Sequence, residues 1–285
     1  MANTQVLRRR IHSVENTAKI CKAMEMIATA KMKRAQDQAM AGRPYAEKIG
    51  QVISNLSAQA KYYGDIHPLL KRREVRKIAI VHFTTDRGLC GGLNANLNRL
   101  VAEFILRQHV PAILITVGRK GRNFMLSTGQ TIHAEFTGIK DKPGLLDIMP
   151  ISRIVIDAYT MGEIDMIYLA YPRFVSTMVQ RPTMETLLPV DPVDFNAVQT
   201  GDYIYEPDHI TVMNALLPRF VEMKTYHTLL ELIASEHSAR MVSMRSASDS
   251  AKDVLEDLTL TLNKARQETI TNEICDICGG AEALK

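Results

Sequence analysis

The sequence predicts an α/β protein: a long antiparallel coiled coil of N- and C-terminal helices, together with a small central α/β domain. Two observations support this prediction. Apolar residues recur with heptad spacing at both ends of the chain, and short β-branched runs flank a helical segment in the middle. We therefore divide the 285 residues into a helical segment at 1–60, a central domain at 75–200 and a second helical segment at 208–285.

The N-terminal segment has an apolar seam whose steps alternate between four and three residues. The seam comprises Leu7, Ile11, Val14, Ala18, Cys21, Glu25, Ala28, Met32, Ala35 and Ala39. This spacing is that of a coiled coil, and Glu25 is the only charged residue in it. Further along, Arg43 and Pro44 predict a kink or the start of a new helix.

The C-terminal segment continues the same alternation from Leu216 to Thr269. Neither Gly nor Pro occurs between Pro218 and Gly279, so the uninterrupted helix would extend about 90 Å at 1.5 Å per residue. A helix of that length cannot be buried in a globule of this size and must project. It also exceeds its N-terminal partner, so its surplus must stand alone or be held by another molecule. Pro218 predicts either a kink or a helix start.

The middle of the chain predicts a Rossmann-like sheet of about four or five strands. The expected strands are 77–83, 112–117, 164–174 and 178–190, and the expected helices are 94–108 and 146–161. The first two strands and the helix between them form a βαβ unit, which implies parallel pairing.

The charge is unevenly distributed over the chain. Residues 1–50 hold ten Lys or Arg against four acids, and a second basic cluster covers 71–77, within a net charge of +4. These clusters indicate either a solvated face or an acidic partner such as nucleic acid, anionic lipid or an acidic protein loop. No run of 18 apolar residues occurs, so we expect no membrane span. The first residues lack the apolar core of a secretory signal, and we expect them to belong to the folded protein.

The glycine-rich stretch TTDRGLCGGLNANL lies where a phosphate-binding loop would lie, after a strand and before a helix. Its spacing is not G-x-G-x-x-G, and G-x-x-x-x-G-K-[ST] is absent from the sequence. A tight turn or a partner-docking loop is therefore favoured over a nucleotide site. Similarly, we interpret GRKGRN at 118–123 as a solvated basic turn in preference to a phosphate site. Because H-E-x-x-H and G-x-S-x-G are also absent, we expect neither catalysis nor a cofactor.

The four cysteines are expected to be reduced. Cys275 and Cys278 form a single C-x-x-C, which lacks the two further ligands of a structural zinc site. We favour two ordinary helical residues, with metal binding and redox chemistry as the alternatives. His227 and His237 fall on the C-terminal seam, where polar residues more often set register than bind metal.

Three stretches resemble the gamma subunits of bacterial F-type ATP synthases, and together they cover nearly the whole chain. They are RRRIHSVENTAKICKAMEMIATAKMKRAQ, TTDRGLCGGLN and SEHSARMVSMRSASDSAKDVLEDLTLTLNKARQETITNEICDICGGAEAL. The resemblance implies a non-catalytic rotor shaft at the cytoplasmic face of the bacterial inner membrane. Its paired helices would stand inside a ring of alpha and beta subunits, and its central domain would form a foot with the epsilon subunit on the c-subunit ring. Proton flow would turn the shaft and so drive ATP synthesis.

The resemblance also implies contact residues. The positions matching contacts with the alpha and beta subunits are Met24, Asp86, Arg87, Cys90, Arg266, Gln267 and Thr271, and those matching the foot on the c ring are Tyr205 and Glu206. Plastid members carry a two-cysteine insertion near 190–210. The corresponding linker here, VDPVDFNAVQTGD, has no cysteine, so we expect no thiol switch.

Two other classes of protein are alternatives to a rotor shaft. An enzyme built on the central domain would need a phosphate loop or a catalytic set, and would bind ATP measurably as an isolated chain. A filament-forming or nucleic-acid-binding coiled coil would self-associate symmetrically or bind duplex DNA with strong salt dependence. The unequal lengths of the two helical segments argue against a simple homodimer.

Overall fold

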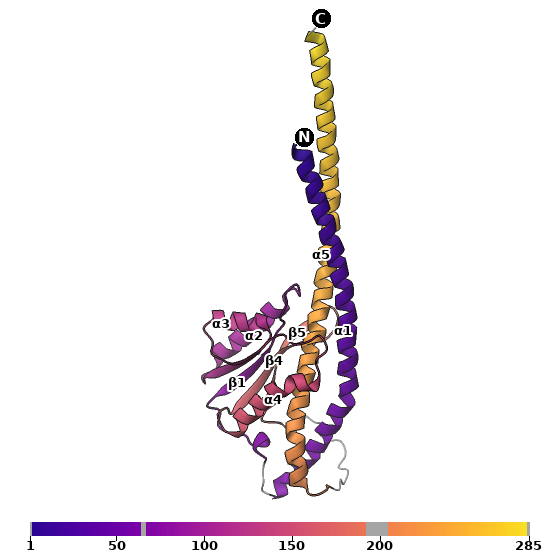
Figure 1. Cartoon of the computed structure of the whole chain (residues 1–285). Helices are drawn as coiled ribbons and strands as arrows, with labels where there is room; N and C mark the ends of the chain where they lie inside the picture. The colour runs from indigo at the N-terminus through magenta and orange to yellow at the C-terminus, as the bar shows by residue number, and fades with distance from the viewer. Residues whose placement is uncertain (1, 64–66, 192–204, 284–285) are drawn as a thin grey trace. The chain divides into compact units, whose positions relative to one another are not determined.

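A computed structural model of the chain describes residues 2–63, 67–191 and 205–283 (Figure 1). The chain forms two compact units, one of Met1–Ala28 with Arg240–Lys285 and one of Thr29–Ala239. Two long helices, α1 (Ala2–Tyr63) and α5 (His209–Ala283), contribute residues to both units. The predicted helices are thus confirmed. Pro44 lies inside α1, and Pro218 lies inside α5 rather than at its start.

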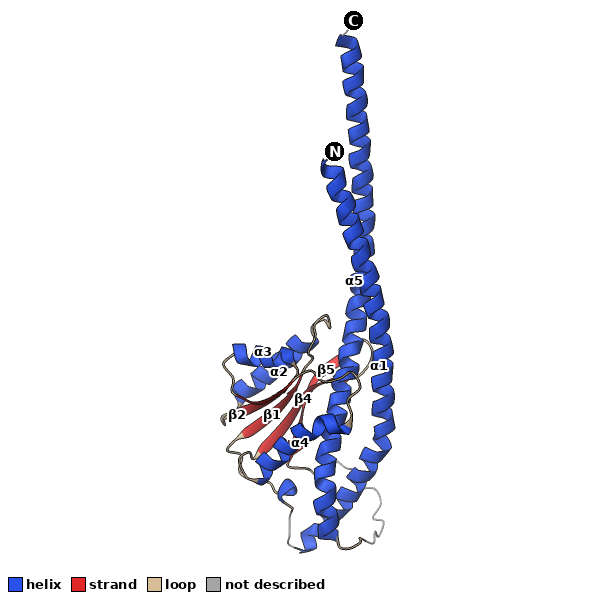
Figure 2. Ribbon diagram, in the orientation of Figure 1, coloured by secondary structure: helices blue, strands red, loops and turns tan. Residues whose placement is uncertain are grey.

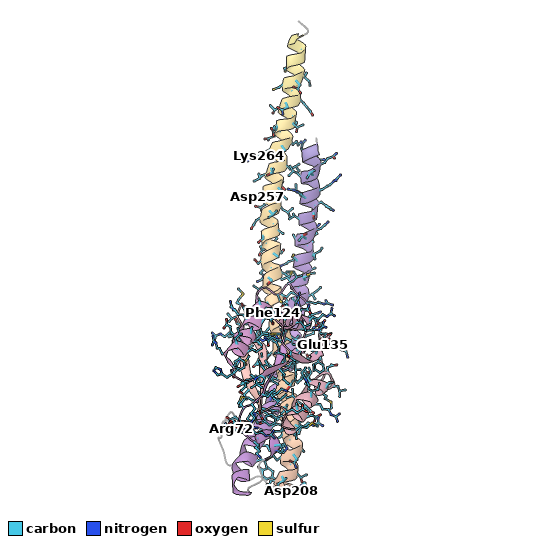
Figure 3. The ribbon with its side chains drawn as sticks, turned by 90° about the vertical axis from the view of Figure 1, so that its left-hand side faces the viewer. Arg72, Phe124, Glu135, Asp208, Asp257 and Lys264 are labelled. Carbon is cyan, nitrogen blue, oxygen red and sulfur yellow. The ribbon has the colours of Figure 1, made fainter. Side chains whose placement is uncertain are left out.

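In the first unit the two helices run antiparallel and side by side (Figures 1 and 3). Leu7, Glu25 and Ala28 of α1 are buried, as are Met241, Met244, Ser248 and Ala251 of α5. The next heptad positions of α5 are half-buried as far as Thr269, and every residue from 270 to 281 is exposed. The predicted seam is therefore confirmed, and the end of α5 has no helical partner in this unit.

The second unit is built on a five-stranded sheet of order β3-β2-β1-β4-β5 (Figure 2). The strands are β1 (Ile78–Phe83), β2 (Ala112–Val117), β3 (Ile132–Phe136), β4 (Met166–Phe174) and β5 (Gln180–Leu188). β1, β2, β3 and β4 pair in parallel with one another, and β5 pairs antiparallel with β4. The strands expected from the sequence are all present, and β5 follows β4 after a short turn.

Helices cover both faces of the sheet, which is why every residue of β1 is buried. The helices of the central segment are α2 (Leu93–Arg107), α3 (Arg119–Ser127) and α4 (Leu145–Thr160), and a short 3₁₀ helix, η1, spans Pro68–Leu70. Ile80 and Leu114 face α2 and α3, where they pack with Val101 and Met125. The opposite face, which includes Val81, packs against α4, α5 and the second half of α1.

The segment from 118 to 136 differs from the sequence expectation. GRKGRN is not a solvated basic turn but the start of α3, which leads into the unexpected strand β3. Gly118 has φ +97°, and a Cβ there would lie 2.1 Å from the Thr84 carbonyl oxygen. A Cβ on Gly121 would lie 2.8 Å from the His82 ring. The glycines are therefore required because the end of β1 packs directly against the start of α3.

Candidate protein interaction surfaces

Glu25, the charged residue of the N-terminal seam, is neutralised inside the two-helix unit. Its carboxylate lies 2.8 Å from Lys22 Nζ on α1 and 3.0 Å from Arg245 Nε on α5. The hydrogen bond from Lys22 makes the largest contribution to lowering the pKa of Glu25, and Arg245 lowers it further, against the opposing effect of burial. The seam thus contains one buried carboxylate that joins the two helices, a geometry that fixes their register.

Met24 lies on the outer surface of the same helix, with 37% of its surface exposed. Ile20, Met26 and Ile27 are also exposed. Single exposed apolar residues are ordinary, but Ile20, Met24 and Ile27 lie within an arc of about 60° on the helix and form a patch that an apolar partner could cover, whereas Met26 lies on the other side. Met side chains pack adaptably, which suits a partner whose surface changes.

Arg266, Gln267 and Thr271 lie on the last part of α5, where all three are exposed. Thr271 Oγ1 donates to the Gln267 carbonyl within the helix, at 2.9 Å. A stripe of exposed isoleucines, namely Ile270, Ile274 and Ile277, occupies the same stretch. The end of α5 therefore presents polar donors together with unburied apolar surface, as an interface does.

The loop after β1 contains Asp86, Arg87 and Cys90, and its conformation is fixed from within the chain. Asp86 accepts from the backbone N–H of Arg119 at 3.0 Å and from that of Gly138 at 2.8 Å. Its carboxylate thereby joins three segments at the carboxyl edge of the sheet: this loop, the start of α3 and the turn after β3. The sequence suggested a partner contact for Asp86 but not this internal role.

Cys90 is buried rather than presented to solvent. It packs with Leu93 and with Ala239 of α5, and Asn94 Nδ2 lies 3.3 Å from its sulfur. Leu89 has φ 64° and is 59% exposed, while Arg87 is also exposed. A partner approaching this loop would therefore meet Arg87 and Leu89, and Cys90 would contribute by holding the loop against α5.

Tyr205 and Glu206 lie together just before α5. Tyr205 is half-buried against the main apolar core, and Glu206 is exposed. Asp208 caps the helix that follows, since its carboxylate accepts from the backbone N–H of Thr211 at 2.8 Å. The same bond lowers the pKa of Asp208. Of Tyr205 and Glu206, only Glu206 presents a charged group to solvent, just before the start of α5.

A cavity of about 440 Å³ lies at the carboxyl edge of the sheet. This edge is where doubly wound sheets bind ligands. Here α5 contributes Leu229, Leu232, Ile233 and His237 to the cavity wall, so α5 itself occupies much of the crevice. The lining also includes Asp141, which lies between Lys31 Nζ at 2.5 Å and His237 Nε2 at 3.8 Å. The hydrogen bond from Lys31 is the main reason why the pKa of Asp141 is lowered.

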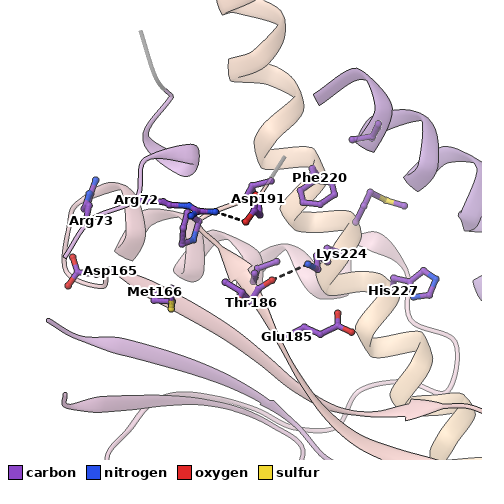
Figure 4. Close-up of a pocket in the computed structure, with 15 residues that line it drawn as sticks. Arg72, Arg73, Asp165, Met166, Glu185, Thr186, Asp191, Phe220, Lys224 and His227 are labelled. Atoms are coloured by element: carbon purple, nitrogen blue, oxygen red, sulfur yellow. Dashed lines mark hydrogen bonds and ion pairs between the residues drawn. The ribbon is translucent and has the colours of Figure 1, made fainter. Parts of the chain in front are cut away.

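A larger cavity of about 960 Å³ lies near the other end of β4 and β5 (Figure 4). Its charged groups are largely engaged: Arg72 pairs with Asp191 at 2.5 Å, and Lys224 Nζ donates to the Thr186 carbonyl at 3.0 Å. Phe220 from α5 projects toward it. Among the residues drawn in Figure 4, no set of unpaired charges converges on a site where a small-molecule ligand could bind.

Sequence reasoning missed the residues that hold α5 to the sheet, notably Asp141, Glu231, Ser235 and Ser238. The one available signal was the polar spacing 231, 235 and 238, which places three polar residues on one face of an otherwise apolar helix. The linker at 190–202, for which the sequence predicts no thiol switch, lies mostly outside the described residues. The described ranges contain no group of three or more potential His, Cys, Asp or Glu metal ligands. None of the described helices combines the length and the apolar character that a membrane crossing requires.

Comparison with known proteins matches residues 3–284 to the family model described as ATP synthase. The ATP synthase gamma chain of Dehalococcoides mccartyi strain CBDB1 is 56% identical over 284 residues, covering all of both chains. The corresponding chain of Acidithiobacillus ferrooxidans strain ATCC 53993 is 47% identical over 290 residues, again covering all of both. A chain in the structure of the Euglena gracilis mitochondrial ATP synthase (OSCP, F1 and c-ring) has the same fold, with a TM-score of 0.70 and 18% identity over 99% of this chain and 95% of that one.

Proposed function

The chain belongs to the ATP synthase gamma chain family, and on that premise we propose that it is the non-catalytic central shaft of a proton-driven ATP synthase. In this proposal the shaft turns inside a ring of alpha and beta subunits and transmits rotation from the c-subunit ring. ATP is made or hydrolysed on other subunits. The shaft acts by contacting each catalytic subunit differently as it turns, which favours one of their conformations over the others.

The observation that carries the proposal is the exposed end of α5. Residues 270–281 are exposed on every side, and Ile270, Ile274 and Ile277 offer apolar surface there. An unpaired helix end of this kind is stabilised when another protein surrounds it. The ring of alpha and beta subunits is the surrounding structure that family membership suggests.

We assign the upper contact with the ring to Arg266, Gln267 and Thr271, and a lower contact to Met24. The ten basic residues within residues 1–50 suit acidic segments on the facing subunits. The loop at Asp86, Arg87 and Cys90 would meet the lower rim of the ring. Glu206, with Tyr205 behind it, would meet the c ring and the epsilon subunit. The chain would then lie at the cytoplasmic face of a bacterial inner membrane.

Co-purification of the tagged full-length chain from its native membranes tests the proposal. Alpha, beta, epsilon and c subunits should be recovered with it and identified by mass. Recovery of the chain alone, or with nucleic acid, would contradict the shaft assignment, and measurable ATP affinity of the chain alone would favour an enzyme instead.

The residue assignments have a separate test in the assembled complex. Arg266→Ala combined with Gln267→Ala should slow ATP synthesis, because charged and amide donors to the ring are lost. Asn272→Ala is the matched control, since this exposed residue belongs to the same stretch of α5 but lies more than about 100° around the helix from both Arg266 and Gln267. Equal effects of the two variants would remove the assignment of the upper contact.

A further inference from the structure

Within the second unit, α5 is bound to the sheet by a row of polar side chains that we name the polar ladder: Lys224, Glu231, Ser235 and Ser238. Glu231 accepts from the backbone N–H of Phe174 at 2.8 Å. Ser235 Oγ donates to the Pro172 carbonyl at 2.8 Å, and Ser238 Oγ donates to the Thr177 carbonyl at 2.7 Å. Lys224 adds its bond to the Thr186 carbonyl.

The four residues of the polar ladder lie on one face of α5. At about 100° per residue, its four positions fall within an arc of about 60° on α5, and they extend over about 21 Å of the helix. The backbone groups that form these hydrogen bonds with the ladder side chains all belong to the β4–β5 hairpin. Ser235 and Ser238 are fully buried, so water cannot replace these bonds without opening the interface.

Ser235 supplies a hydrogen-bond donor that the β4–β5 hairpin lacks at one position. Its acceptor Pro172 is the register partner of Pro182, and neither proline has an N–H to donate across the strands. A buried carbonyl at this level needs a donor from elsewhere, because an unsatisfied one is costly. The Ser235 hydroxyl is that donor, which makes the bond specific to one axial position of the helix.

A second set of contacts holds the same part of α5 from another side. Tyr226 donates its hydroxyl hydrogen bond to the Pro143 carbonyl at 3.1 Å, and His237 lies beside Asp141. Tyr226 and His237 share one face of α5, about 140° around the helix from the ladder. Their partners come from one short segment between β3 and α4, and the other oxygen of Asp141 contacts Lys31 of α1.

We infer that the polar ladder, supported by the Tyr226 and His237 contacts, is the torque-bearing attachment between the sheet domain and the shaft helix. Apolar contacts are non-directional, so packing alone would resist slipping or turning of α5 only through shape. Directional bonds on two faces of a helix must break before it can turn about its axis or slide. This inference rests on the proposed rotor function and assigns Glu231, Ser235 and Ser238 as positioning residues for coupling.

The first test uses the full-length chain alone. Glu231→Leu with Ser235→Ala should raise the amide exchange rate of Phe174 at least about tenfold, since the bond lost is to a charged acceptor. Glu231→Gln retains an acceptor oxygen and should restore most of the protection. The matched control is Thr225→Val with Thr228→Val, whose buried hydroxyls donate only to carbonyls of α5 itself. Unchanged exchange of Phe174 in the ladder variant would overturn the inference.

The second test uses the same variants in the reconstituted ATP synthase. The ladder variant should hydrolyse ATP like the wild type when the proton gradient is collapsed, but lose ATP-driven proton pumping against a gradient, where the shaft is under load. The control and Glu231→Gln should pump normally. If the wild type couples and the ladder variant pumps under load as the control does, the torque assignment is wrong. If the wild-type assembly shows no coupling that depends on this chain, the proposed function fails instead.

Discussion

Replacing Asp86 by alanine removes the carboxylate that joins three segments at the carboxyl edge of the sheet. The backbone N–H groups of Arg119 and Gly138 then lose their acceptor. These donors belong to the start of α3 and to the turn after β3, so the change should loosen both segments while leaving the strands paired.

The magnitude follows from the two hydrogen bonds. A hydrogen bond to a charged group contributes about 1.5–3 kcal/mol, which gives an upper range of about 3–6 kcal/mol for the pair. The Asp86 side chain is 21% exposed, so water recovers part of this, and we expect a loss of about 2–4 kcal/mol of local stability. Asp86→Asn keeps one acceptor oxygen and should cost about half as much.

Amide hydrogen exchange of the full-length chain is the appropriate assay, since a chain with two compact units need not unfold in a single step. Each amide loses one of the two bonds, about 1–2 kcal/mol, so the Gly138 amide should exchange roughly 5- to 30-fold faster in Asp86→Ala. Asp157→Ala is the control, because that acid pairs only loosely with Arg153 on the surface of α4, at 3.9 Å.

A change of less than about threefold at both amides would refute the internal role, since it corresponds to well under 1 kcal/mol. Asp86 would then act only through a partner, as the family resemblance implies, and its variants would show defects in the assembled complex alone. Defects in both the isolated chain and the complex would mean that the loop must be held in shape before it can meet the ring.

Three further changes have defined outcomes. His82 is fully buried, and desolvation lowers its pKa to about 3, so below about pH 6.5 the unfolded chain binds a proton that the folded chain does not. The free energy of unfolding should therefore fall by about 3 kcal/mol between pH 6.5 and 4. In urea titrations, His82→Gln should flatten this pH dependence. Gly118→Ala should destabilise the chain by more than about 3 kcal/mol, because its Cβ would meet a carbonyl oxygen at 2.1 Å. Gly129→Ala has open space and should cost only about 1 kcal/mol, for its positive φ. Equal shifts of the urea unfolding midpoint in the two variants would contradict this. Ile274→Ser with Ile277→Ser should change the stability of the isolated chain by no more than about 0.5 kcal/mol but lower its recovery of alpha and beta subunits, and undiminished recovery would argue against an apolar contact there.

The helices and most strands could be predicted because their signals are local. Heptad spacing identified α1 and α5, since side chains three and four residues apart share a helix face wherever the helix lies. The β-branched runs of β1 and β2, with a helical segment between them, likewise indicated a βαβ unit of parallel strands. The surplus length of α5 also followed from residue counting, and with it the expectation of an exposed end.

The sequence did not predict β3 or α3. Residues 132–136 alternate half-buried and exposed positions, with His133 and Glu135 outward, and five residues at a sheet edge give a weak strand signal. The glycines of GRKGRN suggested a turn, because glycine is common in turns. Only the packing of Gly118 and Gly121 against β1 shows that they are needed for close approach at a helix start.

The roles of individual polar residues were decided by the tertiary structure. Glu25 is an anomaly in its own heptad until Arg245, 220 residues later, is placed beside it. Asp86 and Glu231 are ordinary acids in the sequence, and each gains its role from a backbone N–H contributed by a distant segment. Periodicity within one element can therefore be predicted from the chain itself, because it depends on neighbours three, four or two residues away. Which donor meets which acceptor depends on contacts between segments far apart in the chain, and only the folded structure determines them.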